Sequence, residues 1–206
     1  MTKRLSWLLV AIAALSAAVA GFWLARELDS SAPRLASGTW LSVPRTLADI
    51  QLEDGDGHRF TTQNLQGKPS LVFFGFTHCP DVCPTTLVKL AQVKKTAALA
   101  GLRVLFITVD PQRDTPQAVG AYAHNFDPSF IGLTGDQAAI DQVTRAFAVA
   151  AVRVDLPGGD YTMDHSAQLF LVNSKAQIVG LFSPPFDTRI LTQDLLAVAP
   201  YLDAKS

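Results

Sequence analysis

Cysteine is scarce in this chain of 206 residues, which contains only Cys79 and Cys83. A framework of several disulfides is therefore excluded, and the fold must depend on an ordinary hydrophobic core. A bridge between these two cysteines would close a very small loop, which stabilises a fold little because it constrains the unfolded chain little. We therefore expect the two thiols to serve a function rather than to hold the fold together.

An excess of charge of either sign is also lacking, since 17 Lys and Arg face 18 Asp and Glu, for a net charge of -1. Without a basic surface to neutralise phosphates, nucleic acid is not an expected partner. Internal repeats and low-complexity tracts are absent as well. With 49% hydrophobic and 17% charged residues, the composition is typical of one globular domain with an appendage.

The N-terminal segment has no charge between Arg4 and Arg26. As a helix, the stretch from Leu5 to Ala25 reaches about 31 Å, close to the ~30 Å hydrocarbon core of a bilayer. Lys3 and Arg4 precede it, which predicts a cytoplasmic N-terminus and a translocated remainder. We expect residues 1–26 to anchor the protein in the membrane as a transmembrane helix, with the soluble domain on the extracytoplasmic, periplasmic side.

A cleaved signal segment is the alternative, because Ala18-Val19-Ala20 has the small-x-small form of a cleavage site. The apolar run continues past this site through Leu24, which favours the uncleaved anchor. No cysteine lies near its end, so a lipid-modified N-terminus is excluded. Both alternatives place the bulk of the protein outside the cytoplasm.

The rest of the chain divides into a predicted linker, 27–47, and a predicted domain, 48–206. The linker is rich in serine and proline and has no apolar periodicity. The domain begins with a short β-hairpin over 50–61. The periodicity of apolar residues and the positions of turn-forming residues then predict helices and strands in the order βαβ, α, ββα. The predicted strands are 71–76, 102–109, 131–133, 168–172 and 177–182, and the predicted helices are 84–99, 115–126, 136–148 and 188–201. This order predicts an α/β fold, a thioredoxin-like sheet flanked by helices, with the hairpin as an N-terminal addition.

The cysteine pair follows a buried strand and precedes a helix. Pro84 suits the first helical position, so both thiols are expected to face the positive end of the helix dipole. That position stabilises a thiolate by about 0.3 to 1 kcal/mol. Thiolates serve equally as nucleophiles and as ligands for soft metal ions.

Spacing helps to separate these two uses. Thioredoxin-like reductases carry two residues between their cysteines, whereas Cys79 and Cys83 enclose three. Two sulfurs need a further ligand to hold a metal, and His165 is the candidate, because it precedes a strand whose start lies beside the cysteine loop in a thioredoxin-like sheet. Thioredoxins have a cis-proline there, and this chain has no proline between Pro157 and Pro184. Two thiolates and one imidazole suit one copper ion, Cu(I) or Cu(II), whereas zinc would need a fourth firm ligand.

Other polar residues of these loops have structural alternatives. Asp110, Arg113 and Asp114 are expected chiefly to form turns and caps. Asp81 and Asp164 flank the proposed ligands, and either orient His165 or are solvated. We expect no metal at His58, His78 or His124.

Three segments together resemble the Sco/SenC family of copper-binding proteins: Phe74 to Thr85, Val109 to Pro116 and Tyr161 to Ser166. The resemblance implies copper held by Cys79, Cys83 and His165. It implies a metallochaperone rather than an enzyme, which delivers copper to the binuclear site in the copper-binding subunit of cytochrome c oxidase during its assembly, with another copper chaperone as a candidate donor.

Two alternatives use the thiols without metal. One is a thiol-disulfide reductase, with Cys79 and Cys83 as a redox-active pair that keeps the cysteines of the oxidase copper site reduced. The other is a peroxidase, which is disfavoured because Thr77 lies two residues before Cys79 rather than three.

Overall fold

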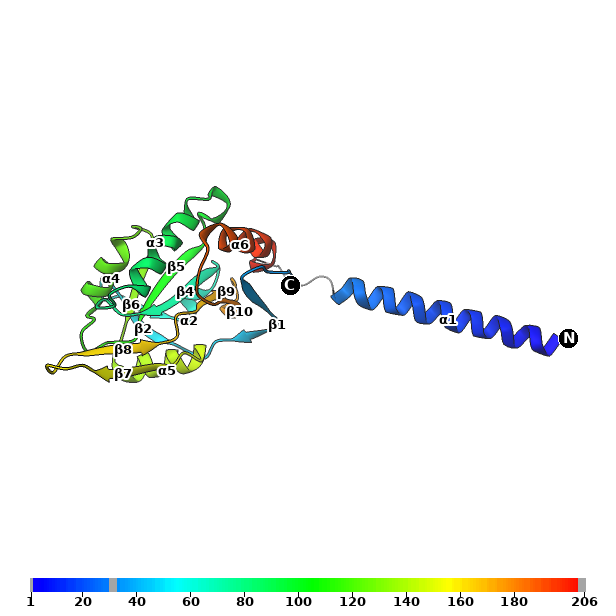
Figure 1. Ribbon diagram of the computed structural model, residues 1–206, viewed down its shortest axis with the longest axis horizontal. Coiled ribbons are helices and arrows are strands. Elements are labelled where there is room, and N and C mark those ends of the chain that lie inside the picture. Colours follow the sequence, from blue (N-terminus) through cyan, green and yellow to red (C-terminus); the bar gives the residue numbers. More distant parts are fainter. Residues whose placement is uncertain (1, 30–32, 204–206) are drawn as a thin grey trace. The chain divides into compact units, whose positions relative to one another are not determined.

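The computed structural model describes residues 2–29 and 33–203, in two compact units, Met1–Pro33 and Arg34–Ser206. The first unit consists of one helix, α1 (Thr2–Asp29) (Figure 1). Among the described residues, no helix combines the length and the apolar character that crossing a membrane requires. The predicted N-terminal helix is therefore present, but its predicted membrane-spanning role is not supported.

The second unit is built on one eight-stranded mixed sheet. β4, β5 and β6 are parallel neighbours at its centre, and the outer strands pair antiparallel. In spatial order the strands are β1 (Gly38–Thr46), β10 (Gln177–Phe182), β9 (Leu169–Val172), β4 (Ser70–Gly75), β5 (Arg103–Thr108), β6 (Ile131–Thr134), β2 (Gln51–Asp54) and β3 (Arg59–Thr61).

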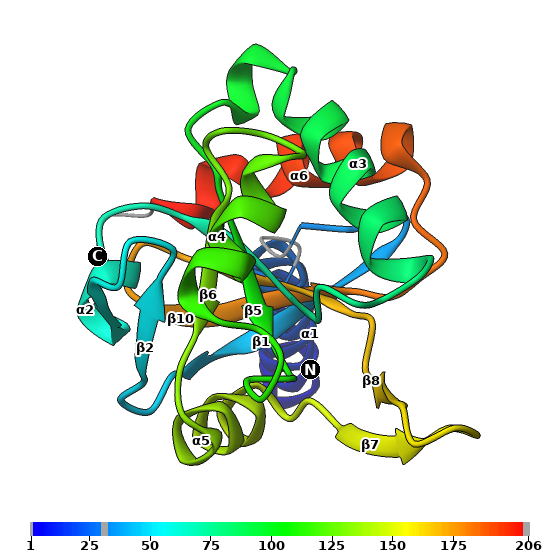
Figure 2. The same ribbon diagram turned by 90° about the vertical axis from the view of Figure 1, so that its left-hand side faces the viewer.

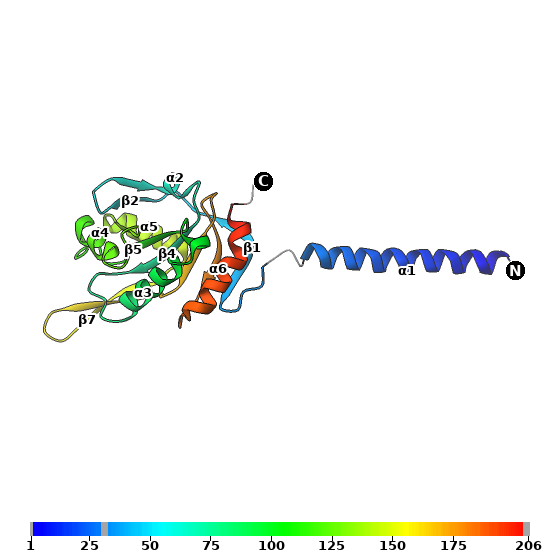
Figure 3. The ribbon, with the colours of Figure 1, turned by 90° about the horizontal axis from the view of Figure 1, so that it is seen from above.

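Helices cover both faces of this sheet (Figures 1 and 3). One face carries α3 (Val82–Lys94), α4 (Pro116–His124) and α6 (Thr188–Leu202), and the short η1 (Ala97–Leu99) follows α3. The other face carries α5 (Gln137–Phe147) and the single turn α2 (Thr62–Leu65). The predicted α/β class, the N-terminal β2–β3 hairpin and the parallel crossover from β4 to β5 are confirmed.

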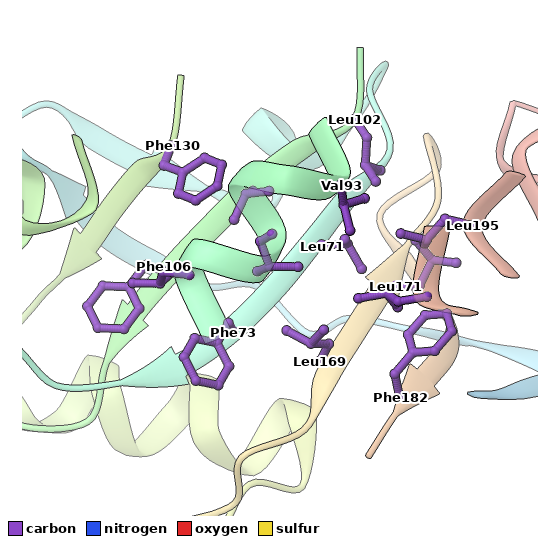
Figure 4. Packing of buried hydrophobic residues seen from close by; sticks show 14 of the residues in the cluster. Leu71, Phe73, Val93, Leu102, Phe106, Phe130, Leu169, Leu171, Phe182 and Leu195 are labelled. Carbon is purple, nitrogen blue, oxygen red and sulfur yellow. The ribbon is translucent and has the colours of Figure 1, made fainter. Parts of the chain in front are cut away.

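Strand β4 shows how the sequence divides the core between the two faces. Successive side chains of a strand point to opposite faces. Leu71 and Phe73 accordingly pack with α3, α4 and α6 (Figure 4), whereas Val72 and Phe74 pack with α5. All four are at most 1% exposed, so β4 is buried on both sides and holds its C-terminal end rigidly.

The predicted linker over 27–47 is wrong in its second half. Residues 38–46 form β1, which pairs with β10 at the edge of the sheet, where Gly38 lies opposite Phe182. Most side chains of β1 are exposed, so no apolar alternation marks it in the sequence. Its backbone pairing is supported by Asp194, which accepts hydrogen bonds from the Ala36 and Ser37 amides at 2.8 and 2.7 Å.

A second, separate sheet also departs from the prediction. β7 (Ala151–Asp155) and β8 (Tyr161–His165) pair with each other and, among the described residues, with no strand of the main sheet. They form a hairpin that projects from the body of the unit (Figure 2). The segment expected as a loop before β9 is therefore a strand, and His165 is its last residue.

Candidate metal centre

The cysteine loop connects the end of β4 to the start of α3. Its first turn is closed by the Cys79 amide, which donates to the Phe76 carbonyl at 3.2 Å. Asp81 is the residue preceding α3, so the helix begins two residues earlier than Pro84 and includes Cys83 in its first turn. The Cys83 amide, one of the free donors of that turn, points at Cys79 Sγ at 3.3 Å.

Gly75 makes room for the second sulfur. Cys83 is fully buried, and a Cβ added at Gly75 would lie 2.8 Å from its Sγ and 2.7 Å from the Phe106 ring. Both distances are shorter than real carbon contacts, so a side chain here would displace the sulfur or the ring. The last residue of β4 therefore sets the depth at which the thiol sits.

His165 reaches the same place from β8. Its Nε2 lies 3.7 Å from Cys83 Sγ, and its ring is contacted edge-on by Phe73 and Phe76. Its Nδ1 lies 3.1 Å from the Ser166 carbonyl oxygen. A carbonyl only accepts, so Nδ1 carries a proton and Nε2 is the ring nitrogen that can bind a metal.

The ligand atoms of Cys79, Cys83 and His165 all lie within 4.8 Å of one another. The premise that a histidine distant in sequence folds back onto the cysteine pair is therefore met by the geometry. Both cysteines are free thiols, and Cys79 and His165 remain partly accessible to solvent.

The two thiols differ in acidity. Cys79 accepts a hydrogen bond from the Cys83 thiol, which is the largest cause lowering the pKa of Cys79 to about 4. Burial opposes this shift, and His165 and the amides of Cys83 and Asp81 assist it. The same shared proton, together with burial, raises the pKa of Cys83 above that of a free thiol. The metal-free centre therefore holds one thiolate and one thiol.

Asp114 holds the cysteine loop from behind. Its side chain is fully buried and accepts from the Thr77 amide at 3.0 Å and from the Thr77 and Thr108 hydroxyls at 2.6 Å each. The expected capping of α4 falls instead to Thr115, which accepts from the Ala118 amide. Asp114 thus has a role at the site that the sequence did not indicate.

Asp110 and Arg113 contact the other half of the site. Asp110 accepts from Arg113 Nε at 2.5 Å and from the Tyr161 hydroxyl at 2.8 Å, so the segment after β5 is joined to β8. From the sequence, these residues were expected chiefly to form turns and caps. The sequence offered no signal for this role, because only burial reveals it: Asp110 is 2% exposed, and a buried carboxylate needs donors.

The remaining candidates lie outside this group. Asp164 is exposed. The hydrogen-bond partner of His165 Nδ1 is the Ser166 carbonyl, so no carboxylate orients the ring through this atom. The carboxylate of Asp81 accepts from Thr85. His78 contacts Thr77 and Asp114. A second group, Asp54, Asp56 and His58, lies on the β2–β3 turn with two of its three members exposed.

A buried sheet that ends in two thiols, completed by an imidazole from a neighbouring hairpin, defines a class of soft-metal-binding α/β domain. The SCO1/SenC family model matches residues 42–199. The chain therefore belongs to the SCO1/SenC family, which confirms the resemblance seen in the sequence.

Individual relatives agree with this assignment. The chain is 40% identical to "Protein SCO1 homolog 1, mitochondrial" of Arabidopsis thaliana over 68% of its own length, and the match spans 43% of that relative. The copper-bound structure of Bradyrhizobium japonicum ScoI has 39% identity and a TM-score of 0.67, and covers 73% of this chain and 98% of that one. BsSco, "a member of the Sco family of cytochrome c oxidase assembly proteins", shares the fold with a TM-score of 0.60 at 20% identity, over 79% and 98% of the two chains. The fold is thus the thioredoxin-like fold of the solved Sco proteins.

Proposed function

We propose that the unit from Arg34 onward is a metallochaperone rather than an enzyme. It binds one copper ion through Cys79, Cys83 and His165 and delivers it to the binuclear copper site of cytochrome c oxidase during assembly. The observation that carries the proposal is the convergence of two sulfurs and one imidazole nitrogen within 4.8 Å. The copper bound to the homologous ScoI supports the choice of metal.

The donor set also supports copper. Soft thiolates select Cu(I), and the addition of imidazole suits both oxidation states. Among the residues that the structure describes, no fourth His, Cys, Asp or Glu joins this group. A structural zinc site has four firm ligands, so a set of three fits zinc less well.

Transfer to a partner requires that the donor site open while copper is still bound. Cys79 and His165 are partly exposed, so a recipient ligand can approach from their side, whereas Cys83 is buried. The recipient's ligands replace those of the donor one at a time, and copper keeps its charge. A proton that leaves a recipient thiol is balanced by one that returns to Cys83. We propose the copper-binding subunit of the oxidase as the recipient and another copper chaperone as the donor.

A second candidate function is thiol-disulfide reduction of the oxidase cysteines. The lowered pKa of Cys79 favours it, since a part-exposed thiolate beside a second thiol is the arrangement of a reductase. The two functions are compatible, because an oxidised recipient cannot bind copper.

His165→Ala separates these two functions. We expect it to weaken Cu(I) binding by more than the about 10- to 100-fold typical of changes around the ligands, because a ligand itself is lost, while the fold is kept. Competition titration with a Cu(I) chelator measures the affinity, and circular dichroism checks the fold. Unchanged affinity would remove His165 from the site. If the variant still supports oxidase assembly in excess copper, thiol reduction is the more important activity.

We also propose that residues 1–26 direct the copper-binding unit out of the cytoplasm. The charge pattern supports this, because Lys3 and Arg4 precede the uncharged segment. Labelling of Cys79 in intact cells by a thiol reagent that cannot cross membranes tests it. A protein that is labelled only after lysis would contradict an extracytoplasmic location.

A further inference from the structure

The β7–β8 hairpin, which carries His165, lacks backbone pairing to the main sheet within the described part of the chain. Its position therefore depends on side-chain contacts and on the short connections to α5 and β9. Any contact that fixes β8 also fixes the distance between the imidazole and the two sulfurs, because His165 is the last residue of that strand.

Three side chains join β8 to the segment after β5. Arg113 Nε donates to Asp110 at 2.5 Å, and its Nη1 donates to the Tyr161 carbonyl at 3.0 Å. The Tyr161 hydroxyl donates to the other oxygen of Asp110 at 2.8 Å. Each residue thus contacts the other two, and the Arg113 guanidinium stacks on the Tyr161 ring at 3.7 Å. We name these three residues the arginine clamp.

The outer side of Tyr161 is held less firmly. Arg153 stacks on its other face at 3.7 Å, but this side chain is 47% exposed and forms an ion pair with Asp155, which is 80% exposed. Exposed ion pairs contribute little. The side chains of Arg113 and Asp110 are 19% and 3% exposed, so the firm attachment lies on the inner side.

We propose that Arg113 is a positioning residue of the metal centre: through the arginine clamp it holds β8 so that His165 Nε2 faces the two sulfurs. Tyr161 is the first residue of β8 and His165 the last, so fixing one end of this short strand fixes the other. Asp114, one residue further along, holds the cysteine loop through Thr77. One short segment, 110–114, therefore sets the spacing between the two halves of the site.

The copper-binding measurements in this test depend on the proposed function. Arg113→Lys keeps the charge and removes the planar fork that reaches both Asp110 and the Tyr161 carbonyl. Tyr161→Phe keeps the ring and removes the hydroxyl. We expect both variants to bind Cu(I) about 10- to 100-fold more weakly and to lose the nitrogen scatterer from the copper X-ray absorption spectrum, while both sulfur scatterers stay.

Arg103→Lys is the matched control. Arg103 is also a partly buried arginine, which donates to the carbonyls of Asn64, Leu65 and Lys68 without contacting the hairpin. It should destabilise the fold without changing the copper spectrum. A nitrogen scatterer and an affinity that stay as in the wild type in both test variants would overturn the proposal, and so would an equal loss in Arg103→Lys. If Arg113→Lys does not fold, Tyr161→Phe decides alone.

Amide exchange of the hairpin in the metal-free protein provides a readout that is independent of copper. We expect the amides of β7 and β8 to exchange about tenfold faster in Tyr161→Phe, while those of β4 keep their rate. Unchanged hairpin exchange would overturn the clamp even if copper binding fell. If the wild type did not bind copper, the proposed function would fail and this exchange measurement would still decide the role of the clamp.

Discussion

The two halves of the metal centre are attached to the protein in different ways. The cysteine loop lies between a fully buried strand and a helix, and the buried Asp114 holds it from the side of the core. His165 lies on a two-stranded sheet that projects from the body and is attached by side chains (Figures 2 and 3). A site that must release its cargo benefits from this difference, because one ligand can move away while the two sulfurs stay in place. The following predictions test how far this asymmetry extends.

Removing the anchor of the cysteine loop should have the largest effect. Asp114→Ala leaves the Thr77 amide and the hydroxyls of Thr77 and Thr108 without their acceptor. We expect the free energy of unfolding to fall by about 3 kcal/mol and the alkylation rate of Cys79 to change. Guanidinium denaturation and iodoacetamide kinetics measure the two quantities.

Asp194→Ala is the control for this prediction. Asp194 is also buried, and it accepts the same number of hydrogen bonds, from the Ala36 amide and from the amide and hydroxyl of Ser37. A comparable loss of stability with unchanged alkylation of Cys79 is expected. Equal alkylation rates in both variants would show that Asp114 stabilises the fold without positioning the loop.

Hydrogen exchange should reveal the difference between the halves in the unmodified protein. Backbone pairs of β4 lie under packed helices, whereas β7 and β8 pair with each other alone among the described strands and contain no fully buried residue. We expect the slowest amides of the hairpin to exchange about 100-fold faster than those of β4. Mass spectrometry of peptic peptides measures this, and equal protection of the two regions would contradict independent motion of the hairpin.

Local sequence patterns predicted the cysteine half of the site better than the histidine half. β4, α3 and β5 were predicted from continuous apolar runs, helical spacing and glycines at the ends of the elements. All three are present, but the helix begins two residues and ends five residues before its predicted bounds. β1 was missed because most of its residues are solvent-exposed, so no alternation of apolar side chains marks it. β8 was missed because none of its residues is fully buried and polar and apolar side chains are mixed along it. Their strand conformation depends on partners that are distant in the sequence.

The ligand set was predicted as one group, and the structure brings its three members together. The residues that position them were not predicted. Thr77 and Asp114 are 37 residues apart, and Asp110 and Tyr161 are 51 apart. Both carboxylates follow β5 in a segment whose prolines and aspartates also have an ordinary turn interpretation. Only their burial shows that the two carboxylates position the site and do not merely form turns. Burial is a property of the tertiary fold, which local sequence does not reveal.

Gly75→Ala tests the depth of Cys83 with one methyl group. The added carbon meets the sulfur and the Phe106 ring at distances below van der Waals contact. Overpacking of this kind costs about 1 to 3 kcal/mol, and we expect Cu(I) affinity to fall as well, because the sulfur is pushed from its place. Gly57→Ala is not a suitable control, since its φ is +79°, whereas Gly101 has open space around it. Gly101→Ala should leave copper affinity unchanged, and equal affinities in the two alanine variants would contradict a spatial role for Gly75.

The proton count on copper binding tests the asymmetry within the thiol pair itself. With the pKa of Cys79 lowered to about 4, that thiol is already ionised at neutral pH, whereas the raised pKa of Cys83 keeps its proton until the metal displaces it. Binding needs both thiolates, so it should release about one proton, and the apparent Cu(I) affinity should rise about tenfold per pH unit. Two thiols with the ordinary pKa of 9.0 would instead release about two protons, and the apparent Cu(I) affinity would rise about 100-fold per pH unit.

Calorimetry in buffers of different ionisation enthalpy counts the protons. The pH range is about 7.5 to 8.5, above the ordinary range of imidazole titration. A value near two would mean that Cys83 does not share its proton with Cys79, and the hydrogen bond between the sulfurs would then have to be abandoned as the origin of their difference.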